Sequence, residues 1–271
     1  MNKLNIIEIG FGPHAKRVYA PSLLEYKDEF NINLSLVVDL KENEEDIRSY
    51  FKNTVFNPEF LFIDPFNEAI PIKLEKYLDD YIKSNNIKAA IISTEPLTHY
   101  VYAEWALKNG LNILMDKPIS TEKNVVSSVT AAKKIESDYL DLLDKYNKLQ
   151  KDRETCFIVN TQRRFHPGFE YVNKLLAEVA VKTNCPVTSI QSSHCDGQWR
   201  LPNEIVTQEY HPYCTGYGKG SHSGYHIFDT VYRFYKNSKV TGKIADFMEI
   251  FSSFVQPRGF LYQINESDYK S

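Results

Sequence analysis

Apolar and polar positions alternate along the first half of the chain in blocks that predict strands separated by helices. Short apolar runs that end at a glycine or a polar residue predict buried parallel strands over residues 4–9, 34–38, 89–93 and 111–115. Apolar residues spaced three or four apart predict helices over residues 16–26, 72–84 and 100–108, the first of them bent or interrupted at Pro21. This alternation predicts βαβ crossovers and a parallel sheet covered by helices on both faces.

The pattern in the rest of the chain is weaker. A long helix is expected within residues 120–150, interrupted near Ser137 and Asp138. A further helix is expected over residues 168–180, and strands over residues 156–160, 187–193, 245–254 and 260–264. The phenylalanine-rich stretch 48–67 is expected to be buried, but its pattern assigns no element. The boundary between two domains is expected near Lys117–Thr121, dividing the chain into residues 1–120 and 121–271.

Composition narrows the class of protein. Hydrophobic residues make up 42% and charged residues 25% of the 271 positions, the balance of a soluble globular protein. A formal net charge of −3 gives no reason to expect nucleic acid or an anionic membrane as a partner. No apolar run approaches the ~18 residues of a membrane-spanning helix. The four cysteines form no C-x-x-C pair and the chain starts without a secretory pattern, so we expect free thiols and a cytoplasmic location.

A glycine-rich turn follows the first predicted strand. The segment from Gly10 to Ala15 has the pattern G-x-G-x-x-A and leads into the first helix. In a dinucleotide site Gly10 permits the tight turn, Gly12 leaves room for a pyrophosphate, and Ala15 lets helix and strand pack closely. The alternative is a tight turn with no ligand.

An acid stands at the end of the second predicted strand. Asp39 has the position of a carboxylate that hydrogen-bonds the adenosine ribose and repels a 2′-phosphate. This favours NAD over NADP, although the nearby Lys41 would soften that preference. The alternative is that Asp39 only ends a strand.

The stretch from residue 89 to residue 120 resembles the signature of the Gfo/Idh/MocA oxidoreductases, which include glucose–fructose oxidoreductase and inositol 2-dehydrogenase. The resemblance rests on a Thr-x-Pro turn followed by histidine, a glycine after the next helix, and a Glu-Lys-Pro turn after the next strand, in which this sequence has Asp in place of Glu. Here these are Thr94-Glu95-Pro96, His99, Gly110 and Asp116-Lys117-Pro118.

Two segments further along the chain extend the resemblance. Residues 162–167, QRRFHP, are similar to the strand-exit segment of the family's second domain. Residues 222–229, HSGYHIFD, are similar to the family's Asp-x-Gly-x-His-x-x-Asp pattern, with His226 at its histidine. His222 stands where the family has its first acid, which is a departure.

The resemblance implies a doubly wound Rossmann domain followed by an α+β domain with a mainly antiparallel sheet, and a cofactor between them. It implies a homo-oligomer, a dimer or a tetramer, that acts on a small-molecule substrate. The last expected strand ends near residue 264, so the second domain is expected to be short or truncated relative to the family.

The same resemblance assigns roles to individual residues. Lys117 would lie near the nicotinamide and the substrate hydroxyl, and His226 would be the acid/base, because imidazole titrates near neutrality. His222 would join the catalytic and substrate-binding residues or mark the loss of the ordinary chemistry. Arg164 would contact the substrate. The residues expected to bind the cofactor are Gly10, Gly12, Ala15, Asp39, Thr94, Glu95, Pro96, His99 and Lys117.

Other readings of these residues stay open. Aromatic residues of segment 199–220, Trp199 among them, are suited to stacking on a sugar ring or to filling a small core. Histidines and cysteines crowd residues 194–226 and would suit zinc, but their spacing matches no compact zinc module, so no metal is expected. The function expected is hydride transfer between NAD, or NADP, and a sugar, cyclitol or related polyol derivative. The alternative is a catalytically silent NAD(H)-binding sensor or regulatory protein with the same fold.

Overall fold

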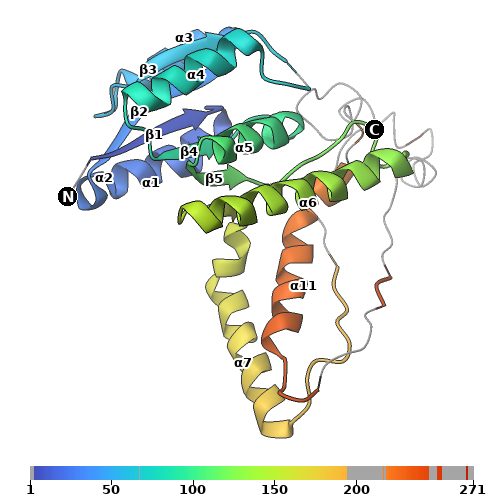
Figure 1. Cartoon of the computed structure of the whole chain (residues 1–271). Coiled ribbons are helices and arrows are strands. Elements are labelled where there is room, and N and C mark those ends of the chain that lie inside the picture. Colours follow the sequence, from blue (N-terminus) through green and yellow to red (C-terminus); the bar gives the residue numbers. More distant parts are fainter. Residues whose placement is uncertain are drawn as a thin grey trace. The chain divides into compact units, whose positions relative to one another are not determined.

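Six parallel strands form one sheet in the order β3-β2-β1-β4-β5-β6 (Figure 1). The computed structural model describes residues 3–66, 68–193, 216, 218–243, 249–251 and 267, and only the backbone of Lys219 and His222. The strands are β1 (Leu4–Ile9), β2 (Ile32–Leu40), β3 (Glu59–Ile63), β4 (Ala89–Ile92), β5 (Asn112–Asp116) and β6 (Phe157–Asn160). The order reverses at β1, which pairs with β2 on one side and β4 on the other. In open parallel sheets, ligands bind at the carboxyl ends of the strands beside such a reversal.

Helices connect the strands and cover both faces of the sheet. They are a π-helical turn η1 (Ala15–Tyr19), α1 (Ala20–Glu25), α2 (Lys27–Phe30), α3 (Glu44–Phe51), α4 (Ile72–Ser84), α5 (His99–Lys108) and α6 (Val129–Asp152), with two 3₁₀ turns, η2 (Lys41–Asn43) and η3 (Pro96–Thr98). Pro21 lies in the first turn of α1, where its missing N–H interrupts no hydrogen bond of that helix. The doubly wound parallel sheet expected from the sequence is confirmed.

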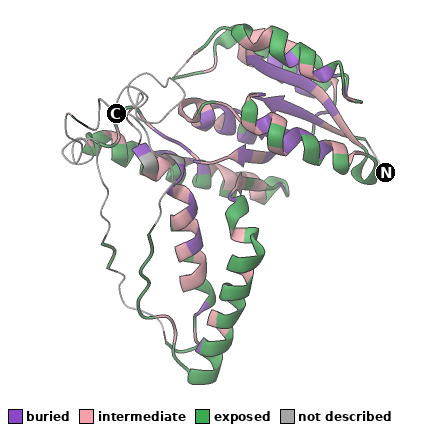
Figure 2. Ribbon diagram, turned by 180° about the vertical axis from the view of Figure 1, so that it is seen from behind, coloured by how far each residue is buried: buried purple, intermediate pink, exposed green. Residues whose placement is uncertain are grey.

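Two cores lie on opposite faces of the sheet, and β1 contributes to both. Ile7 and Ile9 belong to the core under α4, α5 and α6, whereas Ile6 belongs to the core under η1, α1 and α3. Figure 2 shows the buried positions concentrated on the strands and on the inner sides of these helices. A strand buried on both faces has no polar face, which is why β1 reads as a nearly continuous apolar run.

The phenylalanine-rich stretch divides into the end of α3 and the strand β3. Aromatic contacts join the two elements, since Phe51 meets Phe60 edge to face and Phe60 stacks on Phe62. Only residues 48–51 of α3 fall within the stretch, too few to show the period set by its buried Ile47 and Phe51. β3 sends Phe60 and Phe62 to one core and Leu61 and Ile63 to the other, so it shows no apolar–polar alternation.

The interruption expected near Ser137 and Asp138 is wrong. α6 is continuous from Val129 to Asp152, and it begins nine residues later than the predicted stretch. The Asp138 carboxylate is buried within the helix, where it accepts a hydrogen bond from the Ser120 hydroxyl at 2.6 Å and pairs with Lys134. Ser120 from outside the helix, together with Lys134 one turn earlier in it, therefore satisfies a polar side chain that would otherwise favour a break.

Contacts divide the chain into two compact units. The first is made of the described residues of Met1–Thr161 and Thr215–Tyr225, and the second of those of Gln162–Cys214 and His226–Ser271. The first unit extends past residue 120 because β6 pairs with β5 as the sixth strand of the same sheet. The division of function between residues 1–120 and 121–271 stays a prediction.

The second unit contains two helices that lie side by side, α7 (Pro167–Thr183) and α11 (Tyr225–Asn237), the latter from His226 onward (Figure 1). Phe169 meets Phe234 edge to face, and the Asn237 amide donates to the Asn173 side chain at 2.9 Å. The strand predicted over residues 187–193 is wrong: this segment has no regular structure and finds no neighbouring strand among the described residues. The strands predicted beyond residue 244 lie almost entirely outside the described residues.

Candidate functional site

The glycine-rich turn joins β1 to η1 in a conformation that needs glycine. Gly10 has φ +86°, and a Cβ at this position would come within 2.6 Å of the Ser93 backbone at the end of β4. Gly12 differs, because a Cβ there would meet nothing within 4 Å. Gly10 thus lets β1 and β4 approach each other, whereas Gly12 leaves open space at the start of a helix, where N–H groups lack intrahelical acceptors.

Asp39, at the end of β2, secures this turn. Its Oδ2 accepts the Phe11 N–H at 2.5 Å, and its Oδ1 accepts the Leu40 N–H at 2.6 Å and the Asn43 side-chain amide at 2.8 Å. A carboxylate oxygen has two lone pairs, so two donors occupy Oδ1 while Oδ2 can accept one more hydrogen bond. The carboxylate can therefore accept one ribose hydroxyl at Oδ2.

The turn after β4 is held by its own polar groups. Glu95 accepts the Leu97 N–H at 2.8 Å and so caps η3, and the Thr98 hydroxyl donates to the Thr94 hydroxyl at 2.9 Å. Pro96 begins η3, where its fixed φ suits the first position. These contacts give Thr94, Glu95 and Pro96 a defined shape beside the glycine turn; contact with the cofactor stays a prediction.

His99 is completely buried at the start of α5. Its Nδ1 lies 2.7 Å from the Pro118 carbonyl oxygen and its Nε2 lies 3.1 Å from the Thr94 carbonyl oxygen. Burial lowers the pKa of His99, so the ring is neutral at neutral pH and only one nitrogen donates. The buried ring connects the turn after β4 to the turn that contains Lys117. Both turns contain residues predicted to bind the cofactor.

Lys117 follows β5, and its backbone N–H donates to Asp116 Oδ1 at 2.8 Å. The same carboxylate oxygen lies 3.8 Å from Nε2 of His14, which belongs to the glycine turn. On the neighbouring strand β6, the Asn160 amide donates to the Tyr19 hydroxyl at 2.9 Å. The carboxyl edge of the sheet therefore brings the glycine turn and the predicted catalytic lysine together.

His14 lies inside the G-x-G-x-x-A segment and Asp116 inside the Asp-Lys-Pro turn, but the sequence pattern gave neither a role in the site. Tyr19 and Asn160 were also missed. Their sequence signal is positional: Asp116 and Asn160 each end a strand of a parallel sheet, and His14 and Tyr19 belong to the connection after β1. The carboxyl ends of neighbouring parallel strands meet at one edge.

Glu8 lies within β1, two residues before the glycine turn, and is completely buried. Neither of its carboxylate oxygens has a hydrogen-bond partner in the described part of the chain. Burial, with a smaller contribution from the charge of Asp39, raises the Glu8 pKa to about 8. The side chain is therefore mainly protonated at neutral pH.

The predicted site residues of the second unit are only partly described. His226 is buried near the start of α11, and Arg164 pairs with Asp229 through two nitrogens. His222 ends α10 (Gly218–His222), and nothing is described of its side chain. Trp199 lies outside the described residues. The roles of His226, His222, Arg164 and Trp199 stay predictions.

The described residues hold no group of three or more metal-ligating side chains, but His194, Cys195, His211 and Cys214 lie outside them. Among the helices that the structure describes, none is both long and apolar enough to cross a bilayer.

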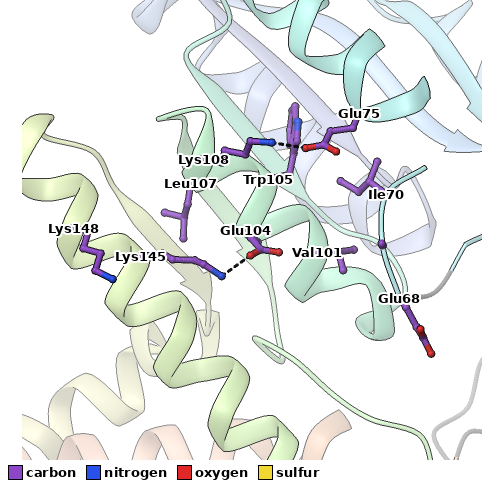
Figure 3. Close-up of a pocket in the computed structure, with 11 residues that line it drawn as sticks. Glu68, Ile70, Glu75, Val101, Glu104, Trp105, Leu107, Lys108, Lys145 and Lys148 are labelled. Carbon is purple, nitrogen blue, oxygen red and sulfur yellow. Dashed lines mark hydrogen bonds and ion pairs between the residues drawn. The ribbon is translucent and has the colours of Figure 1, made fainter. Parts of the chain in front are cut away.

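A pocket of about 500 Å³ lies elsewhere in the first unit, between α4, α5 and α6 (Figure 3). Its lysines are paired: Lys108 with Glu75 at 2.7 Å, Lys145 with Glu104, and Lys148 with Asp144 at 2.6 Å. The pocket is charged and largely balanced, and it contains none of the residues predicted to bind cofactor or substrate.

The sequence matches a family described as oxidoreductases with an NAD-binding Rossmann fold, Gfo/Idh/MocA, over residues 4–143. The chain belongs to this family, whose Rossmann fold binds NAD. No curated protein sequence matches the chain.

Three solved structures share its fold. The WlbA (WbpB) dehydrogenase from Thermus thermophilus, solved with NAD and UDP-GlcNAcA, has 16% identity and a TM-score of 0.53 over 85% of this chain and 62% of that one. YvaA from Bacillus subtilis, described as an oxidoreductase, has 17% identity and a TM-score of 0.53 over 85% and 51%. A Thermotoga maritima protein described as a dehydrogenase has 15% identity and a TM-score of 0.50 over 86% and 55%. The chain thus spans 51% to 62% of the length of these structures.

The residues at the glycine turn fit a bound NAD. Gly12 leaves the open space that a pyrophosphate needs, and Oδ2 of Asp39 retains one acceptor position for a ribose hydroxyl. β1, β2 and β4 lie side by side in the first unit, so the predicted contacts of Gly10, Gly12 and Asp39 with the cofactor would all come from that unit.

Proposed function

We propose that the protein is an NAD-dependent oxidoreductase acting on a sugar, cyclitol or related polyol derivative. The observation that carries the proposal is the 3.8 Å approach of His14 to Asp116, which brings the glycine turn against the turn of Lys117. A lysine beside a dinucleotide turn is placed to stabilise the charge that develops on a reacting oxygen. Bound NAD supplies the nicotinamide that accepts or gives the hydride.

The substrate class is supported by the family and by one of the solved structures. The WlbA dehydrogenase structure contains UDP-GlcNAcA, a nucleotide-linked sugar acid. Hydroxyl-bearing carbons of such molecules are what an NAD enzyme oxidises. We therefore propose a hydroxyl or keto carbon of a sugar-like ring as the reacting group.

In this proposal Lys117 and His226 are the two residues that transfer protons. When the substrate is oxidised, its O–H proton passes to the Lys117 amine while hydride leaves the same carbon. His226 is the second acid/base group, because imidazole both takes and returns protons near neutrality. His222 and Arg164 bind substrate hydroxyls.

The test is turnover of the Lys117→Ala variant on a panel of sugars, cyclitols and nucleotide-linked sugars. We expect a loss of at least ~100-fold in kcat, because a proton-transfer group is removed. The dissociation constant of NADH, followed by nicotinamide fluorescence, should rise far less than kcat falls, because the other predicted cofactor contacts remain. Lys108→Ala is the matched control, since that lysine lies in the separate pocket. Unchanged turnover of Lys117→Ala would contradict the assignment.

A silent NAD(H)-binding protein is the second candidate. The observation in its favour is that Arg164, expected to bind substrate, is engaged by both oxygens of Asp229. Such a protein would bind NADH with the same preference and show no exchange with any member of the panel. Turnover of a single substrate that depends on Lys117 would exclude it.

The proposal includes the cell compartment and the assembly. We place the protein in the reducing cytoplasm, which suits Cys156 and Cys185, both free and exposed. We also propose a homo-oligomer, a dimer or a tetramer. Sedimentation equilibrium of the purified chain tests the assembly directly.

A further inference from the structure

His14 brings an imidazole into the carboxyl edge of the sheet. It stands between Gly12 and Ala15, and its Nε2 lies 3.8 Å from Oδ1 of Asp116. Its ring meets the Tyr19 ring edge to face, with centroids 5.4 Å apart. Tyr19 is itself held by the Asn160 amide at 2.9 Å. The ring thus contacts Tyr19 and faces Asp116 at the end of β5.

Two ordinary structural roles do not account for this side chain. His14 is the N-cap residue of η1, but its side chain makes no capping hydrogen bond. Its Nε2 is buried and has no hydrogen-bond partner among the described residues. A buried polar atom without a partner costs stability, and such atoms in native proteins cluster at functional sites.

Asp116 links His14 to Lys117. Its Oδ1 accepts a hydrogen bond from the backbone N–H of Lys117 at 2.8 Å, and the same oxygen faces His14 Nε2. A carboxylate facing one ring nitrogen favours the tautomer with the proton on that nitrogen, which leaves the other as an acceptor. The 3.8 Å separation is too long for a direct hydrogen bond, but the nearby negative charge leads us to expect the proton on Nε2 and the acceptor at Nδ1. A quarter of the His14 side chain is exposed, so the ring can exchange protons with water.

We propose that His14, oriented by Asp116, is the proton relay of Lys117. The inference rests on the proposed function. In the oxidation of an alcohol, the substrate C–H bond breaks with transfer of hydride to the bound nicotinamide, and the O–H proton passes to the Lys117 amine. His14 Nδ1 then accepts the proton from the Lys117 ammonium and releases it to water. Reduction of a ketone runs the same transfers backward.

The first experiment needs no substrate. In protein labelled with ¹⁵N-histidine, the neutral His14 ring should carry its proton on Nε2, with Nδ1 unprotonated. Asp116→Asn should convert this state into a mixture of tautomers, because an amide no longer favours one of them. A proton found on Nδ1 of the wild-type ring would overturn the proposal, whatever the enzyme turns over.

The second experiment is chemical rescue of His14→Ala on a substrate found by the panel. We expect a fall in kcat of at least ~10-fold at low buffer concentration, since proton transfer to solvent loses its carrier. Added imidazole should restore most of that loss, with the NADH dissociation constant within about twofold of the wild type. His166→Asn is the matched control: His166 caps α7 by accepting the Gly168 N–H at 3.1 Å, and asparagine can also cap.

The outcomes separate the two proposals. If Lys117→Ala abolishes turnover but His14→Ala does not slow it, the oxidoreductase assignment stands and the relay is wrong. A loss in His14→Ala that imidazole does not restore, with weakened NADH binding, would assign His14 to the shape of the turn and overturn the relay. If no substrate is turned over, the proposed function fails, and the tautomer measurement still decides whether Asp116 orients His14.

Discussion

Two polar regions of the first unit differ in whether their polar groups have partners. One is the carboxyl edge of the sheet at the glycine turn, and the other is the pocket of Figure 3. At the edge, both oxygens of Glu8 and Nε2 of His14 are buried without a hydrogen-bond partner in the described part of the chain. In the pocket, Lys108, Lys145 and Lys148 each have a carboxylate partner.

The difference separates polar groups that cost stability from those that do not. An exposed ion pair contributes little in either direction, so a charged pocket can be an ordinary solvated surface. A buried carboxyl or imidazole without a partner is expensive, and folding alone gives no reason to keep it. A charged pocket is therefore a poor guide to the site here, and buried polar atoms without a hydrogen-bond partner are a better one.

The largest expected effect is on the pH dependence of stability. The Glu8 pKa is about 8 in the folded protein against 4.5 for an unburied carboxyl, so the folded state holds more protons between these values. The free energy of unfolding should fall as pH rises from about 4.5 to 8, by as much as ~5 kcal/mol. Glu8→Leu should remove most of this slope and stabilise the protein at pH 8. Urea unfolding across this range measures it, and an unchanged slope would exclude Glu8 as its source.

Substitutions at the two glycines of the turn should affect different properties, protein stability for Gly10 and NADH binding for Gly12. Gly10→Ala places a Cβ against the Ser93 backbone at a positive φ, so the free energy of unfolding should fall by ~1–3 kcal/mol or more. Gly12→Ala meets no protein atom, so stability should hold while NADH binding weakens at least ~10-fold, equivalent to ~1.4 kcal/mol. Thermal unfolding and fluorescence titration separate the two effects. Normal NADH affinity in Gly12→Ala would show that the pyrophosphate lies elsewhere.

Asp39→Ala should have an intermediate effect. It removes the acceptor of the Phe11 N–H and the carboxylate that would bind a ribose hydroxyl. NADH binding should weaken ~10-fold, the size of one charge-assisted hydrogen bond, and the preference over NADPH should shrink. Parallel titrations with NADH and NADPH measure this. Equal loss for both cofactors would assign Asp39 to the turn alone.

The smallest effect is expected in the pocket. Lys148→Ala breaks an exposed pair with Asp144, so the free energy of unfolding should change by less than ~1 kcal/mol. NADH affinity and turnover should match the wild type. A clear loss of either would mean that the pocket takes part in function and that the comparison above fails.

The sequence by itself determined the elements whose pattern is local. The apolar run of β1, the helical spacing of α4 and the G-x-G-x-x-A turn depend on neighbours a few residues away, and each occurs where it was expected. The family and its cofactor followed from the same local motifs.

Only the tertiary structure decided the rest, because it depends on contacts between distant residues. α6 continues past Asp138 because Ser120 reaches its carboxylate, and the segment 187–193 is no strand because no partner strand lies beside it. The meeting of His14 with Asp116 joins residues a hundred positions apart. Spacing along the chain says nothing about such pairs: parallel strands bring their carboxyl ends to one edge only after the crossovers have folded.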